Sequence, residues 1–457
     1  MGEKTKFTRR EFMRIAGAGA GVCAAGCLRD LPQKLIPYVV APDEIIPGVA
    51  AWYAGTCFEC AAHCGTLVRV REGRAVKIEG NPLHPVNSGG LCALGQSAVQ
   101  AAYDPDRLRE PMRRNADGSF SAVPWNDALY SAAEAIARAR EGGKRVVLIS
   151  EALSLSEAAL AREFCGKTGA EHLQYQVFPA DEVEQAASAV FGAGVRADYD
   201  LSRADCVVSF GADYLGTWRS PVEFTRARST RRAPDAEKGG TAAIFPRAVH
   251  FEPRLSLTAA NADRWYKTAA GSECSVLGVL FRKIVEYGGW DPAGQDSGRV
   301  AKKNVRSAAV RYGMRLCAGD ALHPGCGVTE SEIEALAREL GQCRAPLIIC
   351  GGPVMSGADG ERAMLISLLL NIVLGAAGKT VRLCRASAEA KLPEVLSSGL
   401  SARLAEGPVP EVLIVAQVNP FFTLPEKSGF SRLLERVPFV VSLSVNLDET
   451  AERAHLV

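Results

Sequence analysis

The sequence predicts an α/β protein in which a small, β-rich domain is followed by larger domains built on doubly wound parallel sheets. From Trp125 onward, short apolar runs alternate with amphipathic segments, the pattern of strands joined by crossover helices. Residues 53–95 instead hold two short alternating runs around Glu72 and Gly73, which is typical of a hairpin. The length of 457 residues and the apolar fraction of 47% suit two or three domains with a large core.

Each expected element follows from its local pattern. In the small domain, strands are expected at residues 66–70 and 75–78. In the larger domains, strands are expected at 145–150, 172–178, 205–210, 242–245, 346–350, 380–383, 412–416 and 439–443. Helices are expected at 126–141, 156–168, 180–191, 274–287, 330–340, 361–374 and 387–392, with Ser156 as the N-cap of the second.

A set of cysteines in the small domain carries the chemistry. Cys57, Cys60, Cys64 and Cys92 follow the spacing C-x2-C-x3-C-x27-C, in which three thiols share one loop and the fourth returns after the hairpin. A [4Fe–4S] cluster needs four converging thiolates, and a close trio with one distant cysteine is a usual way to supply them. A four-cysteine zinc site and two disulfides remain open on spacing alone.

The segment after the trio reads E-G-N-P-x-H-P-V-N-x-G-x-L-C-x-x-G-Q over residues 79–96. Together with the cysteine spacing, it resembles the iron–sulfur domain of the molybdopterin oxidoreductase (DMSO reductase) family, and the resemblance extends over residues 35–457. Residues 37–48, 103–107 and 209–218 are similar, more narrowly, to the large iron–sulfur subunits of alternative complex III and the related quinone reductase complex. The resemblance implies a [4Fe–4S] cluster on the four cysteines and α/β domains like the family's domains I–III.

The same resemblance implies a molybdenum bis-molybdopterin guanine dinucleotide, held in the family by loops that correspond here to Gly351–Gly352 and Asn419–Pro420. Two departures predict that this chain lacks it. The loop expected to carry the molybdenum ligand, residues 176–185, contains no Ser or Cys, and its candidate metal-binding carboxylate is Asp181. Leu94 stands where catalytic members have a basic residue. We also expect the family's β-rich C-terminal domain to be missing after Val457.

The first thirty residues are expected to be a targeting segment. T-R-R-E-F-M at 8–13 is a twin-arginine pattern, and the apolar run 15–28 is shorter than the ~20 residues that cross a bilayer. We therefore expect export to the periplasmic face of the cytoplasmic membrane, with lipidation of Cys27 as a weaker hypothesis. The expected domains are a signal segment (1–30), an extended arm (31–52), the cluster domain (53–110) and the α/β domains (111–457).

Three functional hypotheses follow. The first is an iron–sulfur electron-transfer subunit of a membrane-bound respiratory quinone/cytochrome oxidoreductase complex, without substrate chemistry of its own. The resemblance implies as partners a ferredoxin-like iron–sulfur subunit, a multihaem cytochrome c and quinone-binding membrane subunits. The others are a catalytic molybdenum bis-pterin oxidoreductase and a non-redox structural subunit. The net charge of +2 gives no indication of a nucleic-acid partner.

Several further side chains bear on these hypotheses. His63, between two of the cysteines, is expected at the solvent edge of the cluster rather than as a ligand. His84 is expected to lock its N-P-L-H-P turn by hydrogen bonding. Eight cysteines beyond the leader and the cluster show no metal-type spacing, and the sequence indicates no disulfide pairing among them: Cys165, Cys206, Cys274, Cys317, Cys326, Cys343, Cys350 and Cys384.

Overall fold

A computed structural model of the chain describes residues 46, 48–151, 153–177, 182–192, 195–232, 246–288, 300–385, 395–396 and 399–457. The expected signal segment and nearly all of the expected arm before Val49 lie outside these residues. So do the strand expected at 242–245 and the helix expected at 387–392. Within the described part of the chain, no helix has both the length and the apolar character that crossing a membrane requires.

The small domain is a three-stranded sheet in the order β1-β2-β3, formed by Ala51–Thr56, Gly65–Arg71 and Arg74–Gly80. Glu72 and Gly73 both have positive φ, +49° and +76°, as the two central residues of a type I′ turn require. The predicted hairpin is therefore confirmed. The α2 helix, Ala93–Ala101, follows the sheet, and a short antiparallel pair, β4 (Met112–Arg114) with β5 (Phe120–Ala122), comes next.

The first α/β unit contains a parallel sheet in the order β14-β7-β6-β15-β16. Its strands are β6 (Val146–Ser150), β7 (Glu171–Tyr175), β14 (Val395–Leu396), β15 (Val412–Ala416) and β16 (Phe439–Leu443). One apolar core joins this sheet to α3 (Trp125–Glu141) and α4 (Leu155–Thr168), and a second joins it to α12 (Leu400–Ala405) and α14 (Phe430–Leu434). Both faces of the sheet are therefore covered by helices, as predicted.

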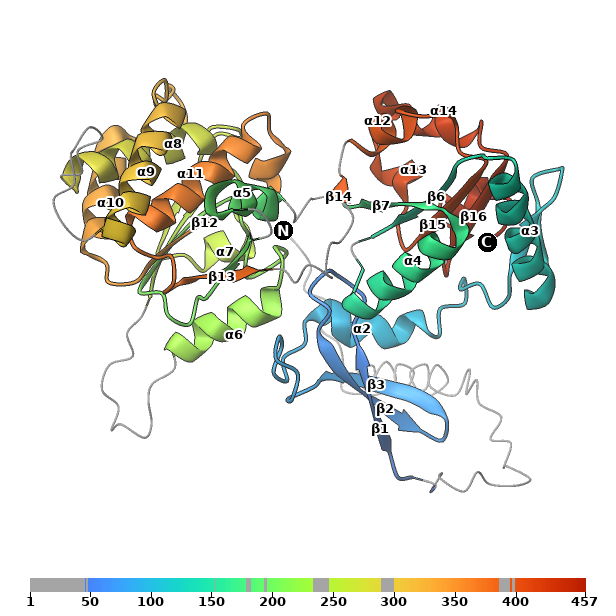
Figure 1. The fold of residues 1–457 in the computed structure, drawn as a ribbon. Coiled ribbons are helices and arrows are strands. Elements are labelled where there is room, and N and C mark those ends of the chain that lie inside the picture. Colours follow the sequence, from blue (N-terminus) through green and yellow to red (C-terminus); the bar gives the residue numbers. More distant parts are fainter. Residues whose placement is uncertain are drawn as a thin grey trace, which may run out of the picture. The chain divides into compact units, whose positions relative to one another are not determined.

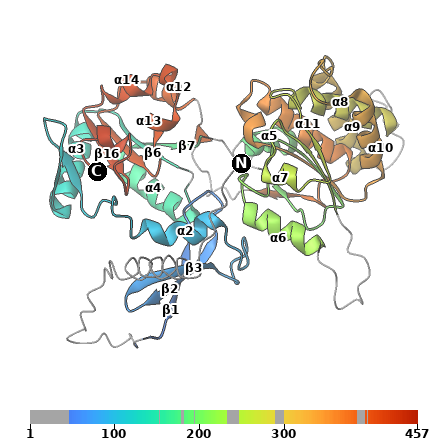
Figure 2. The same ribbon diagram turned by 180° about the vertical axis from the view of Figure 1, so that it is seen from behind.

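The second α/β unit contains a parallel sheet in the order β11-β10-β9-β12. Its strands are β9 (Cys206–Phe210), β10 (Arg247–Phe251), β11 (Arg264–Tyr266) and β12 (Pro346–Cys350), and β8 (Val195–Tyr199) pairs antiparallel with β13 (Val381–Arg385). Helices α8 (Glu273–Tyr287), α9 (Val300–Leu316), α10 (Glu330–Gln342) and α11 (Gly360–Val373) gather over one side of this sheet, and α6 (Pro221–Arg232) lies on the other (Figures 1 and 2). The α5 helix (Glu182–Phe191) also packs on α11.

Shorter helices complete the described chain. They are α7 (Leu257–Ala260), α13 (Pro420–Thr423), and the 3-10 turns η2 (Gly352–Ser356), η4 (Glu426–Ser428) and η5 (Ala451–Arg453). The last residues of the chain pair with two strands. His455 N donates to Val440 O over 2.9 Å, and Val457 and Met112 exchange two backbone hydrogen bonds of 2.9 Å. The carboxyl end thus extends the first sheet beyond β16 towards β4.

The order of the strands along the chain reveals an insertion. Strands β6 and β7 belong to the first sheet, residues 182–385 build the whole second unit, and β14, β15 and β16 then return to the first sheet. The alternation of strands and helices along the sequence does not show this break, because both units alternate in the same way. Of the second unit's elements, β8, β10, β11, α6, α7, α9 and η2 were not predicted. The three strands β8, β10 and β11 are short and carry charged residues, so they lack an apolar run. The α9 helix is rich in basic side chains.

The start of α4 was predicted wrongly. The structure places the start of α4 at Leu155 and gives its N-cap to Ser154 instead of Ser156. Ser154 and Glu157 form a capping box, in which the Ser154 side chain accepts from Glu157 N and the Glu157 side chain accepts from Ser154 N over 3.0 Å. Ser154 and Ser156 both stand near the start of the helical run. Only Ser154 is followed by a Glu three residues later, so only Ser154 can form the reciprocal pair.

Candidate metal centre

The three clustered cysteines lie on the loop that joins β1 to β2. Cys57 follows β1 directly and Cys64 directly precedes β2, and Cys57 N donates to Cys64 O over 2.8 Å. Between them, His63 N donates to Cys60 O over 3.3 Å, and His63 has a φ of +46°. This closed turn holds the trio at one end of the small sheet. Cys64 is buried, Cys57 is half-buried and Cys60 is exposed.

A return loop after β3 brings the fourth cysteine to the same end of the sheet. A Cβ on Gly80 would overlap the carbonyl groups of Gly89 and Gly90, so the absence of a side chain allows this loop to touch the end of β3. Asn81 N donates to Gly65 O and Gly89 N donates to Asn81 O, each over 2.9 Å. The loop ends at Cys92, which is the N-cap of α2.

Asn87 fastens the two halves of the centre together. Its Oδ1 accepts from Gly65 N over 2.9 Å, while its Nδ2 donates to Gly65 O over 2.8 Å and to Gly90 O over 2.7 Å. The side chain is fully buried. One amide therefore ties the residue next to Cys64 to the loop that precedes Cys92. The sequence analysis missed this role, for which an Asn in a glycine-containing turn was the only signal.

His84 locks its turn through its backbone. Its N–H donates to Asn81 O over 3.1 Å, and its carbonyl accepts from Ser88 N over 2.9 Å. The ring packs against the Cα of Gly65, where an added Cβ would overlap it. The buried Nδ1 of this ring has no hydrogen-bond partner among the described residues. The expected turn-locking function is thus confirmed for the backbone, whereas the ring acts by packing.

The four thiols influence one another electrostatically. Burial raises the pKa of the Cys64 thiol to about 11, and the charges of Cys60, Cys57 and Cys92 add to this effect. Burial likewise raises the pKa of Cys57, with contributions from Cys60 and Cys92. Four thiolates facing one another are therefore costly unless positive charge lies between them. Iron ions supply such charge, and the amino terminus of α2, with its positive end at Cys92, favours anions.

Zinc and a [4Fe–4S] cluster place different demands on a set of four thiolates. Among the side chains that the structure describes, no three or more His, Cys, Asp and Glu residues are grouped so that they could hold one metal ion. A mononuclear zinc site requires its thiolates at ~2.3 Å from a single ion. A [4Fe–4S] cluster instead carries its four thiolates on four separate irons.

His63 lies beside the cluster loop with its ring edge against Phe58, at a centroid distance of 5.9 Å. Its Nδ1 is buried and has no hydrogen-bond partner in the described part of the chain. The ring is half-buried, which agrees with a position at the edge of the centre. Its role as a ligand or as a neighbour of the cluster remains a prediction.

The loops expected to hold a pterin nucleotide make packing contacts and hydrogen bonds with other parts of the protein. A Cβ on Gly211 would overlap Val354, a Cβ on Gly351 would overlap the Trp218 indole, and Gly352 lies against Gly211 O. The glycines that follow β9 and β12 thus serve the packing of these two loops against each other. At Asn419, Oδ1 accepts from Thr450 Oγ1 over 2.6 Å and Nδ2 donates to Glu449 Oε2 over 2.6 Å.

Two other positions bear on the pterin cofactor. Leu94, where a basic side chain is expected in catalytic members, is the second residue of α2 and is 59% exposed. The side chains of residues 178–185, which include Asp181, lie outside the described residues. Leu94 is apolar and therefore offers no positive charge at its position.

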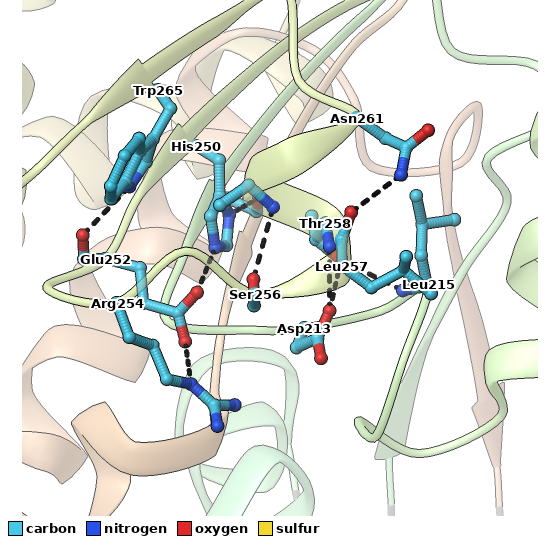
Figure 3. Close-up of polar contacts among 12 residues, drawn as sticks. Asp213, Leu215, His250, Glu252, Arg254, Ser256, Leu257, Thr258, Asn261 and Trp265 are labelled. Carbon is cyan, nitrogen blue, oxygen red and sulfur yellow. Dashed lines mark hydrogen bonds and ion pairs between the residues drawn. The ribbon is translucent and has the colours of Figure 1, made fainter. Parts of the chain in front are cut away.

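A buried polar network lies at the carboxyl ends of β9 and β10 and was not predicted (Figure 3). His250 Nδ1 shares a 2.5 Å hydrogen bond with Ser209 Oγ, and His250 Nε2 lies 3.0 Å from Glu252 Oε2. Arg254 Nε donates to Glu252 Oε1 over 2.9 Å. The order Ser–His–Glu is that of a hydrolytic triad, but Ser209, His250 and Glu252 are each at most 1% exposed. No substrate reaches them, so the network is structural.

A neighbouring network secures the loop after β9. Asp213 Oδ1 accepts from Thr258 N over 2.9 Å and from Thr258 Oγ1 over 2.7 Å, and Thr258 Oγ1 accepts from Leu215 N over 3.0 Å (Figure 3). Asp213 and Thr258 are both buried. The carboxyl edge of the second sheet is therefore held by contacts among its own side chains.

Two protein-family models match this chain. The model of the molybdopterin oxidoreductase Fe4S4 domain matches residues 50–104, and that of molybdopterin oxidoreductase matches residues 107–457. The menaquinone reductase molybdopterin-binding-like subunit of Nitratidesulfovibrio vulgaris is 28% identical over 98% of this chain and 64% of its own length. The thiosulfate reductase molybdopterin-containing subunit of Salmonella typhimurium is 24% identical over 98% of this chain and 62% of its own.

The chain thus spans less than two thirds of the length of these two relatives. Among solved structures, acetylene hydratase from Pelobacter acetylenicus matches with a TM-score of 0.65 and 14% identity. That match covers 88% of this chain and 62% of the hydratase. At this identity the likeness concerns the fold.

Proposed function

Because the chain belongs to the molybdopterin oxidoreductase family, we propose that it is the iron–sulfur electron-transfer subunit of a membrane-bound, quinone-linked respiratory complex. The observation that carries the proposal is the set of four thiols that the β1–β2 loop and the amino end of α2 bring together within the match to the Fe4S4 domain. The similarity to a menaquinone reductase subunit supports the link to quinones.

In this proposal Cys57, Cys60, Cys64 and Cys92 hold a [4Fe–4S] cluster, which supplies one-electron transfer. The chain contributes the surroundings that set the reduction potential. Burial of Cys64 lowers the local dielectric constant, Asn87 holds the ligand loops in place, and the end of α2 stabilises negative charge. The exposed Cys60 marks the side of the cluster that is nearest to solvent and therefore to an electron-transfer partner.

We further propose that this subunit holds no molybdenum. Three features support this: the apolar Leu94, the packing of the loops at Gly211 and Gly351 against each other, and the engaged amide of Asn419. The second candidate is a catalytic molybdenum enzyme. It is favoured by the match of residues 107–457 to the molybdopterin oxidoreductase model and by the molybdopterin-containing relatives. A structural, zinc-binding subunit is the third.

The proposed location is the periplasmic face of the cytoplasmic membrane, reached by twin-arginine export. The partners proposed from the family resemblance are a ferredoxin-like iron–sulfur subunit, a multihaem cytochrome c and quinone-binding membrane subunits. The T-R-R-E-F-M pattern at residues 8–13 supports the route. Replacing both Arg9 and Arg10 with Lys tests it, because the exported form should then disappear from the periplasmic fraction. Unchanged export of this variant would contradict the route.

Metal analysis of the full chain purified without oxygen tests the cofactor content. The proposal expects about four iron atoms per chain, no molybdenum, and an electron paramagnetic resonance signal after reduction. Cys92→Ser should abolish that signal, while Cys165→Ser, which changes a partly buried thiol on α4, should leave it unchanged. Molybdenum near one atom per chain would establish the second candidate, and zinc without iron the third.

A further inference from the structure

Two cysteines that are far apart in the sequence meet at the amino end of β9. Cys206 is the first residue of β9, and Cys343 is the C-cap residue of α10. The chain after Cys343 is fastened to the residue before Cys206. Arg344 N donates to Asp205 Oδ2 over 2.9 Å, and Ala345 N donates to Asp205 Oδ1 over 3.0 Å. Pro346, the first residue of β12, is then the direct register partner of Cys206.

The two side chains lie close together, because Cys343 packs against the buried core that contains Cys206, and each thiol acts on the pKa of the other as a hydrogen-bond partner. Both are reduced in the structure. The Sγ of Cys343 also donates to Glu339 O over 3.3 Å, which fixes its position at the end of α10. Cys206 is 1% exposed, whereas Cys343 is half-buried and is therefore the more exposed of the two.

The contact makes the two thiols chemically unequal. The hydrogen bond from Cys206 lowers the pKa of the Cys343 thiol, although burial opposes this effect. The same hydrogen bond, together with burial, raises the pKa of Cys206. Asp205, Glu339 and Arg247 are the charged groups that face the pair, and Arg247 Nε lies 2.8 Å from Glu339 Oε1. The more acidic thiol is thus also the accessible one, as nucleophilic attack requires.

We propose that Cys206 and Cys343 are a dithiol pair that closes to a disulfide when the protein meets an oxidised thiol. The Cys343 thiolate attacks a sulfur of the incoming disulfide and expels one thiolate. Cys206 then loses its proton, attacks the Cys343 sulfur in the mixed disulfide and expels the second. Two protein thiols are oxidised, one external disulfide is reduced to two thiols, and both protons pass to the thiols that leave.

Four cysteines outside the metal centre, Cys165, Cys274, Cys317 and Cys326, do not combine these features. Cys274 contributes to the raised pKa of Cys317, but both side chains are buried, so an external disulfide reaches neither. Burial is the only cause that raises the pKa of Cys165, and Cys326 donates to Val328 O over 3.1 Å. Among these cysteines, only at Cys206 and Cys343 does a thiol that is partly exposed lie beside a second thiol. This is why oxidation should join these two cysteines.

The bond would join the end of α10 to the amino edge of the second sheet. The loop it closes contains β10, β11, α8, α9 and α10, so it restricts a long stretch of the unfolded chain. Restriction of this kind stabilises the folded state, and for a loop this long the melting temperature should rise by about 5 °C or more. Formation of this disulfide in the cell rests on the proposed periplasmic location, because disulfides persist there. The reactivity of the two thiols towards an external disulfide does not depend on that location.

The test uses the full chain with its cluster, incubated without oxygen in oxidised glutathione. Remaining thiols are alkylated in acid, and the protein is digested without reductant for mass spectrometry. We expect a peptide that links Cys206 to Cys343, lost on treatment with dithiothreitol. Cys343→Ala should leave Cys206 alkylated, and Cys206→Ala should leave glutathione on Cys343. Cys165→Ala is the matched control and should retain the link.

The variants are needed only for the order of attack, since the link itself is sought in the unchanged chain. Absence of the linked peptide, or a link from Cys206 to a different cysteine, would overturn the proposal. So would a melting temperature that is the same in the oxidised and reduced chain. Iron content measured in the same samples keeps this result separate from the proposed function, because the pair lies outside the cluster domain and neither outcome alters the four cluster ligands.

Discussion

At the scale of single residues, the metal centre depends on a side chain that is not a ligand. Asn87 makes three hydrogen bonds from a fully buried position, and they connect Gly65, beside Cys64, with Gly90, near Cys92. A buried amide of this kind leaves several backbone groups without partners when it is removed, at about 1–3 kcal/mol for each unsatisfied group. The loops that carry the cysteines would then be held only by their backbone contacts.

Asn87→Ala should therefore lower the free energy of unfolding by roughly 2–4 kcal/mol and reduce the iron retained through purification. The matched control is Asn115→Ala, which removes an exposed amide that bonds to Ser119 and Ser121 in the β4–β5 turn. Iron per chain and thermal melting are the measurements. Full iron content and an unchanged melting temperature in Asn87→Ala would show that the loops hold the cysteines without this amide.

Glu252 makes a second prediction at the residue scale. Burial alone would raise the pKa of this carboxyl, but hydrogen bonds from His250, Ser256 and Arg254 lower it to about 2. The folded pKa is below the unfolded value of about 4.5, so this group stabilises the protein fully above pH 4.5. The contribution is lost as the pH falls towards 2. Glu252→Gln should cost roughly 3 kcal/mol at pH 7.

The difference between the parent chain and Glu252→Gln should shrink as the pH falls below about 4.5. Urea denaturation followed by tryptophan fluorescence, repeated from pH 7 to pH 3, measures this difference, and loss of the cluster affects both chains alike. Glu435→Gln is the control, because that carboxylate is exposed. A difference that stays constant over this range would contradict the assigned pKa.

At the scale of elements, helix boundaries are set by reciprocal contacts that span four residues. The α4 helix begins after Ser154 because Glu157 completes a capping box with it, whereas Ser156 lies inside the helix. The α10 helix begins in the same way, with Thr329 and Glu332 as the pair. The short helices α7 and α13 have side-chain N-caps without a reciprocal partner, at Ser256 and Asn419, and other helices rely more on burial. The α11 helix, for example, is buried along almost its whole length and packs on β12 and α8.

Ser154→Ala should lower the free energy of unfolding by about 1 kcal/mol, because Glu157 N loses its acceptor. Ser156→Ala is the matched control on the next turn of chain and should change it by less than about 0.5 kcal/mol. Equilibrium urea denaturation of both variants gives the comparison. Equal losses in the two variants, or a larger loss in Ser156→Ala, would mean that the helix starts where its sequence pattern alone placed it.

At the scale of the whole molecule, the parts of the chain differ in what stabilises them. The two α/β units have apolar cores of their own. The small domain has few buried side chains, and all six residues of β1 are exposed. Small domains without a sufficient core commonly rely on a metal for stability. In this protein the cluster would therefore supply much of the stability of the small domain.

Removal of iron by oxidation and chelation should accordingly unfold residues 51–104 while both α/β units stay folded. Hydrogen–deuterium exchange with mass spectrometry should show rapid exchange in β1, β2 and β3, with β9 and β15 still protected. Cys92→Ser should give the same pattern without chelation. Protection of β2 and β3 that is unchanged in the iron-free chain would refute this dependence on the metal.

Local pattern accounts for much of the fold. The hairpin around Glu72 and Gly73 and the strands β6, β9, β12, β15 and β16 were predicted because side-chain alternation and turn residues depend on near neighbours. The strand β10 was missed because His250 and Arg247 interrupt its apolar run. In the structure, hydrogen bonds to Ser209 and Glu252 satisfy the two ring nitrogens of His250 and so allow its burial. A buried polar side chain has no recognisable pattern until its partners are known.

The sequence by itself determined which thiols share one loop, which segments form strands, and the family to which the chain belongs. Only the tertiary structure decided that residues 182–385 form a separate unit between β7 and β14, that Asn87 joins the two halves of the metal centre, and that Cys343 meets Cys206. The physical reason is that these contacts join residues far apart along the chain. Periodicity describes which face of a segment is apolar, and it contains no information about which distant segment will cover that face.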